Sequence, residues 1–69
     1  MVKDFPLFSI EKLMRKAGAE RISSQALKEM KSILIELAEE IGKEAVMLAS
    51  HAKRVTVRRE DIKLAAKRR

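Results

Sequence analysis

The feature that most constrains this chain is an apolar stripe that repeats at helical spacing from residue 24 to residue 52. Spacings of three and four residues place such side chains on one face of an α-helix. No proline interrupts the stretch, and Ser23 or Ser24 can cap its start by accepting from free backbone amides. A helix of roughly 27 residues would be about 40 Å long. The stripe consists of Leu27, Met30, Leu34, Leu37, Ile41, Ala45 and Leu48.

The predicted length of this helix implies a partner chain. A compact domain of this size has a diameter of roughly 28 Å, so the remaining residues cannot cover a 40 Å helix. We therefore expect a dimer, most simply of two crossed copies. Its core would be Leu27, Met30, Leu34, Leu37 and Ile41. The alternative is a monomer with a frayed, solvated helix, which the persistence of apolar residues along the whole stretch argues against.

Composition narrows the possible classes of protein. The 69 residues fit a single domain, residues 1–69, with no cysteine and one histidine, which disfavours a disulfide framework or a metal site. No apolar run approaches 18 residues and the N-terminus lacks a signal-peptide pattern, so we expect a soluble intracellular protein without membrane contact. Without a glycine-rich phosphate loop or a plausible catalytic set, we expect no enzymatic activity and no cofactor.

Positive charge is concentrated outside the central helix. Residues 1–25 carry a net charge of +2, residues 26–50 carry −2 and residues 51–69 carry +6. This distribution favours a polyanion bound by the flanking segments, and it disfavours a polyanion bound along the helix middle. With two phenylalanines and no other aromatic residue, a binder of stacked single-stranded bases is disfavoured. The alternative is a solvated basic tail that serves solubility.

Shorter elements are expected on both sides of the long helix. An extended lead over residues 1–8, with Phe5, Leu7 and Phe8 packing on a neighbour, should precede a helix over residues 10–17 that Ser9 caps and Gly18 ends. Extended loops are expected at residues 19–23 and 53–58. A third helix should follow, with acidic residues in its first turn. The predicted fold class is therefore all-α, with a short, a long and a short helix separated by two strand-like loops.

Two of these segments resemble archaeal histones. Residues 16–23, Lys-Ala-Gly-Ala-Glu-Arg-Ile-Ser, are similar to the end of the first helix and the first loop of that family. Residues 51–57, His-Ala-Lys-Arg-Val-Thr-Val, with Asp61-Ile62 after them, are similar to the second loop. The Lys-Arg-Val-Thr variant is closer to a eukaryotic core histone than to most archaeal ones. The resemblance extends from about residue 5 to residue 68.

The resemblance implies a histone fold, a handshake dimer and sequence-nonspecific binding of double-stranded DNA, which the protein would wrap or compact into nucleosome-like particles. It makes Arg21 the candidate minor-groove arginine and Thr56 of the other copy the residue that orients it. It also makes Arg54 and Asp61 a structural ion pair. Dimers would join into tetramers or longer arrays through Leu48, His51 and Asp61. The DNA-binding set would be Lys12, Arg15, Lys16, Arg21, Lys53, Thr56 and Arg58.

The chain departs from the archaeal pattern at three positions. Lys53 replaces a frequent glycine, Val55 replaces a frequent lysine, and Lys63 lies where an acidic residue is common. Two alternatives in function remain. The first is a histone-fold subunit of a transcription or replication factor, acting as a heterodimer with a histone paralogue. The second is a helix-turn-helix regulator, for which the central helix is too long. We expect the protein in the cytoplasm, associated with the chromosome or nucleoid.

Overall fold

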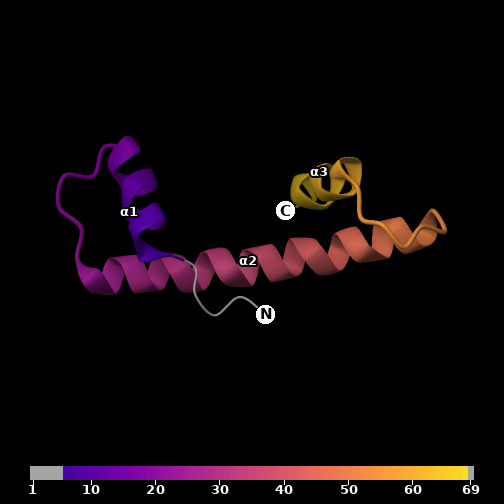
Figure 1. The fold of residues 1–69 in the computed structure, drawn as a ribbon, viewed down its shortest axis with the longest axis horizontal. Coiled ribbons are helices and arrows are strands. Elements are labelled where there is room, and N and C mark those ends of the chain that lie inside the picture. The colour runs from indigo at the N-terminus through magenta and orange to yellow at the C-terminus, as the bar shows by residue number, and fades with distance from the viewer. Residues whose placement is uncertain (1–5, 69) are drawn as a thin grey trace. The chain divides into compact units, whose positions relative to one another are not determined.

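The computed structural model of the chain describes residues 6–68. It contains three α-helices in the order α1, Leu7–Lys16, then α2, Ser24–His51, then α3, Arg59–Lys67 (Figure 1). Within residues 6–68 there is no β-strand, so the chain has the expected all-α class and element order. None of the three helices is long and apolar enough to span a bilayer.

The first helix begins earlier than the sequence predicts. Pro6, with φ −63° and ψ 120°, occupies the N-cap of α1, and no side chain caps the helix. Leu7 and Phe8 are therefore helical, and Ser9 lies inside the first turn instead of capping it. The reason is that proline needs no backbone N–H at this position and its fixed φ suits the entry to a helix. The predicted extended lead is wrong for residues 7 and 8, and its first five residues, Phe5 included, lie outside the described part.

The first helix ends as predicted, at Gly18. Its backbone N–H donates to the Arg15 carbonyl at 3.0 Å, and the Ala19 N–H donates to the Met14 carbonyl at 3.1 Å. These two bonds form a Schellman motif, which satisfies carbonyls that the helix leaves free. The motif requires a positive φ, and Gly18 has a φ of +108°.

The central helix α2 runs without interruption from Ser24 to His51, 28 residues, or about 42 Å at the standard rise. Of the two serines that could cap it, Ser23 does so: its hydroxyl oxygen accepts from the Ala26 N–H at 3.0 Å. The far end closes in a second Schellman motif, in which the Lys53 and Arg54 N–H groups donate to the Ser50 and Ala49 carbonyls.

The chain forms two compact units, residues 1–36 and residues 37–69. The N-terminal unit contains α1 and the first half of α2, and Ile10 is its one fully buried large side chain among the described residues. The C-terminal unit contains the second half of α2 and α3. Its buried residues are Ala45, Ala49, Asp61 and Ala65.

Most of the apolar stripe on α2 is not buried within one chain. Of its members, Ala45 is buried, Leu37 is 39 % exposed and the others are partly buried. Outside the stripe, Ile33 is 49 % and Met47 59 % exposed, and of the described hydrophobic residues only Ile10 and three alanines are buried. Val57, Ile62 and Leu64 are also exposed. Burial of apolar surface is the main stabilising term in folding. A single copy of this chain therefore lacks most of the buried apolar surface that a domain of its length needs.

Candidate nucleic-acid interface

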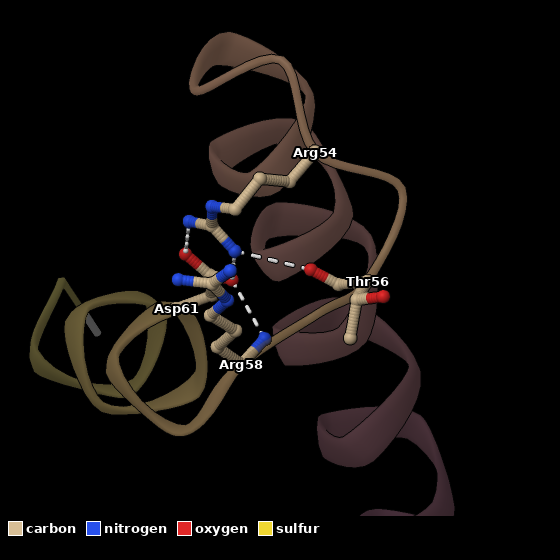
Figure 2. A network of polar contacts seen from close by, with 4 residues as sticks. All are labelled: Arg54, Thr56, Arg58 and Asp61. Atoms are coloured by element: carbon tan, nitrogen blue, oxygen red, sulfur yellow. Dashed lines mark hydrogen bonds and ion pairs between the residues drawn. The ribbon is translucent and has the colours of Figure 1, made fainter.

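The loop between α2 and α3 is held in place by a network of polar contacts centred on Asp61 (Figure 2). The Arg54 guanidinium donates to both carboxylate oxygens of Asp61, at 2.9 and 3.0 Å. One of its nitrogens also donates to the backbone carbonyl of Thr56 at 3.0 Å. The planar guanidinium matches a carboxylate with two parallel bonds, which fixes its orientation as well as adding energy. Arg54 thus ties the loop to the start of α3.

The same carboxylate caps α3. The Arg58 backbone N–H donates to Asp61 at 2.8 Å, so a side chain three residues inside the helix satisfies the N-cap amide. Asp61 is only 5 % exposed. Hydrogen bonds from the Arg54 guanidinium and from the Arg58 backbone lower the pKa of Asp61 to about 2, and Asp61 in turn raises the pKa of Arg54. The carboxylate is therefore charged over the whole physiological range.

The other predicted residues of this loop stay on the surface. Lys53, Thr56 and Arg58 are exposed. Within the described residues, the side chains of Lys53 and Thr56 make no hydrogen bond or ion pair, and Val55 is fully exposed. Because Arg54 is bound to Asp61, the cations that this loop can offer to an outside anion are Lys53 and Arg58.

The residues predicted to join dimers also lie in the C-terminal unit. Leu48 is half-buried and His51 is exposed in the last turn of α2. Both carboxylate oxygens of Asp61 are already bonded within the chain. Of the three, Leu48 and His51 therefore have side-chain surface that is not already bonded within the chain.

The remaining predicted DNA contacts belong to the N-terminal unit. Lys12 and Lys16 are exposed on α1, where they line an open hollow of about 290 Å³ together with Ser9 and Leu13. Arg15 is bound locally, to the Glu11 carboxylate at 2.9 Å and to the Glu20 carbonyl at 3.0 Å. Arg21 is exposed in the first loop. Of these four predicted contacts, Arg15 alone forms an ion pair within residues 6–68.

Sequence reasoning missed the Arg15–Glu11 pair and two further interactions of charged residues. The Lys12 ammonium lies 5.2 Å from the centre of the Phe8 ring, a cation–π contact at the i,i+4 spacing. That spacing is visible in the sequence once both residues are assigned to a helix. Arg68 pairs with Glu44, 24 residues away on α2, and no local sequence pattern predicts such a pair. Groups of three or more potential metal ligands are absent from residues 6–68.

Comparison with known proteins gives one consistent result. Residues 3–66 match the family model described as "Histone-like transcription factor (CBF/NF-Y) and archaeal histone". The chain is 48 % identical over 64 residues to one subunit of the archaeal histone HAN1 of Thermococcus zilligii, covering 93 % of this chain and 96 % of that one. It is 44 % identical over 62 residues to probable archaeal histone 3 of Methanocaldococcus jannaschii, covering 90 % and 92 %.

The family match spans nearly the whole chain, and the order of a short, a long and a short helix agrees with it. The chain therefore belongs to the family of histone-like transcription factors and archaeal histones, and its fold is the histone fold.

Proposed function

We propose that this chain is a DNA-packaging histone: it forms a handshake dimer that binds double-stranded DNA without reading its sequence and compacts it. The partner is a second copy or a histone paralogue. The observation that carries the proposal is the concentration of exposed cations in and around the second loop. Residues 51–69 carry a net charge of +6, and the buried acid of this segment, Asp61, is already neutralised by Arg54.

The incompletely buried stripe on α2 supports the dimer. Leu27, Met30, Leu34 and Ile41 are only partly buried within one chain, and Leu37 is 39 % exposed. A second α2 laid across this stripe would remove these side chains from water, at about 25 cal/mol for each Å² buried. Pairing would therefore supply the core that one chain lacks.

Phosphate chemistry supplies the binding mechanism. Lysine and arginine side chains neutralise phosphates and release condensed counterions, which gives affinity without sequence preference. Lys12, Lys16, Lys53 and Arg58 are exposed and take this role in the proposal. Arg15 joins them only by exchanging its bond to Glu11 for a phosphate.

Arg21 is proposed to enter the minor groove, as arginines do in the nucleosome. Thr56 of the second copy would lie beside it and orient its guanidinium. The exposure of both side chains leaves them available for this contact. Sequence preference would then come from how easily the DNA bends, because no base edge is read.

Larger assemblies are proposed to form through Leu48 and His51, with Asp61 holding the adjoining loop. Dimers joined there would form tetramers or longer arrays on DNA. A protein of this kind is associated with the chromosome, and we place it in the cytoplasm. It requires no cofactor and catalyses no reaction.

The test is binding to random-sequence duplex DNA over a salt series. Affinity should fall by roughly a thousand-fold or more between 50 and 200 mM salt if six or more phosphates are contacted. Arg21→Ala should weaken binding and bending, whereas Lys28→Ala, an exposed cation on α2, should leave both nearly unchanged. Affinity that does not respond to salt would overturn the phosphate mechanism. Equal binding by the Arg21 variant would remove the groove assignment.

Partner identity needs a separate measurement. Size-exclusion chromatography with light scattering on the purified chain should give the mass of a folded dimer. A chain that stays monomeric or unfolded alone would show that a paralogue is the required partner. Nuclease digestion of long DNA covered with the protein then reports the size of the assembly, and His51→Ala should shorten the protected fragments.

A further inference from the structure

Lys53 is the one non-glycine residue with a positive φ among residues 6–68, at 59°. It occupies the position after the end of α2 where the Schellman motif turns left-handed. Its own N–H donates to the Ser50 carbonyl at 2.8 Å and the Arg54 N–H donates to the Ala49 carbonyl at 2.9 Å. Glycine is the usual residue there, because any side chain on Cβ crowds the backbone in this conformation.

The turn at the end of α1 can be compared directly with the turn at Lys53. The same motif ends α1, with bonds of 3.0 and 3.1 Å in the equivalent places, and there the residue is Gly18. The two turns have the same hydrogen bonds, so the turn alone does not require a lysine. Lys53 therefore adds backbone strain that glycine would avoid.

No contact of the Lys53 side chain itself compensates for this strain within the described residues. The Lys53 side chain is exposed and forms no hydrogen bond, ion pair or ring contact in residues 6–68. Strained residues persist where the surrounding structure fixes their conformation, and they cluster at functional sites. The next residue, Arg54, is the one cation of this loop that Asp61 already binds. The lysine is thus one of two cations the loop can offer to an outside anion.

We propose that Lys53, to which the proposed function assigns a phosphate contact, is held in its left-handed conformation at a cost in the stability of the free protein. At this residue the requirements of folding and of binding oppose each other. The inference rests on the proposed function, because it takes the anion to be DNA. It adds that Lys53 lowers the stability of the free protein while it raises the affinity of the complex.

The experiment compares three substitutions at one position, at equal protein concentration because melting of a dimer depends on concentration. Lys53→Gly should raise the melting temperature by about 5 °C, since it relieves the backbone strain. Lys53→Asn should raise it less, because asparagine tolerates this conformation better than lysine does. Lys53→Arg keeps both the charge and the strain, so its melting temperature should be unchanged.

DNA binding should change in the opposite direction. Lys53→Gly and Lys53→Asn should both weaken DNA binding by about five- to ten-fold at 0.1 M salt. Both should also reduce the slope of log affinity against log salt by about one for each lysine that binds. Lys53→Arg should bind like the unmodified protein. Using asparagine as well as glycine separates loss of charge from loosening of the loop.

Three results would overturn the inference or separate it from the proposed function. A melting temperature that does not rise in Lys53→Gly would show that the left-handed lysine costs nothing. Unchanged affinity and salt slope in the glycine and asparagine variants, while the unmodified protein binds DNA with steep salt dependence, would show that Lys53 makes no phosphate contact. If the unmodified protein itself binds DNA without salt dependence, the proposed function fails first.

Discussion

The two loops that flank α2 begin with the same backbone turn and are then stabilised in different ways. In the first loop, Gly18 supplies the positive φ, and an exposed arginine, Arg15, donates to the Glu20 carbonyl. In the second loop, Lys53 supplies the positive φ, and Arg54 donates to the Thr56 carbonyl and to a nearly buried carboxylate, Asp61. The first loop has a relaxed turn and weak side-chain contacts, whereas the second has a strained turn and strong ones.

The difference shows how a loop can carry a strained residue. The Asp61 carboxylate accepts three hydrogen bonds, two from Arg54 and one from the Arg58 backbone, and so fixes both ends of the second loop. Such a connection lets the local conformation be set by the network and not by the intrinsic preference of Lys53. The first loop has no equivalent connection among the described residues, so its turn depends on glycine.

The largest effect should come from removing the charge of Asp61. Asp61→Asn keeps the size of the side chain but leaves the Arg54 guanidinium without its carboxylate in a part-buried place, which is a costly arrangement. We expect the melting temperature to fall further than with any of the other substitutions. Glu11→Gln is the matched control, since it breaks the exposed Arg15 pair of the first loop, and exposed pairs contribute at most about 1 kcal/mol. Equal losses in the two variants would contradict the contrast between the loops.

Acid should act through the same carboxylate. Because the folded protein lowers the pKa of Asp61 from 3.8 to about 2, the unfolded chain takes up a proton first as the pH falls. The contribution of Asp61 to stability is therefore fully present above about pH 4 and disappears as the pH falls through about 2. Melting curves from pH 7 to pH 2 should show a decline in that window that is smaller in Asp61→Asn. A decline of the same size in both proteins would assign acid sensitivity to other carboxylates.

A smaller effect is expected at the glycine of the first loop. No heavy atom of the described residues lies within 4 Å of the place that a Cβ on Gly18 would take, so a side chain would fit in space, and the cost lies in its φ of +108°. Gly18→Ala should therefore destabilise the protein by about 1–2 kcal/mol, and Gly18→Asn by less. Denaturant unfolding measures both. If Gly18→Ala costs nothing, the two turns do not differ in their need for glycine, and the strain assigned to Lys53 becomes doubtful as well.

The parts of the fold that depend on neighbouring residues could be predicted from the sequence. The long α2, its serine cap and the end of α1 at Gly18 follow from periodicity and turn chemistry, and all three are present. The predicted start of α1 is wrong, because Ser9 has the chemistry of a cap while Pro6, three residues earlier, begins the helix. The Arg68–Glu44 pair is not predictable, because it joins residues 24 positions apart and depends on tertiary structure.

In the candidate site, too, some contacts could be predicted from the sequence and others could not. The Arg54–Asp61 pair follows from the resemblance to histones, since a separation of seven residues across a loop and a helix start has no pattern of its own. The residue type of Lys53 argues against its left-handed conformation, and the one sequence signal for it is the glycine that archaeal histones frequently have at this position. The contacts of Arg21, Thr56 and the surface lysines involve a second chain and DNA, so they stay predictions.

The smallest effect is expected at the end of the first loop that leads into α2. The experiment tests whether a local contact also holds this end. Ser23→Ala removes the oxygen that accepts from the Ala26 N–H, and a lost serine cap costs about 1 kcal/mol. Ser24→Ala is the matched control, because Ser24 is the first helical residue and alanine is favourable there. Denaturant unfolding should show a loss in the first variant and none in the second. A loss in Ser24→Ala alone would mean that Ser24 is the cap, so that α2 begins one residue later in solution and the first loop is one residue longer.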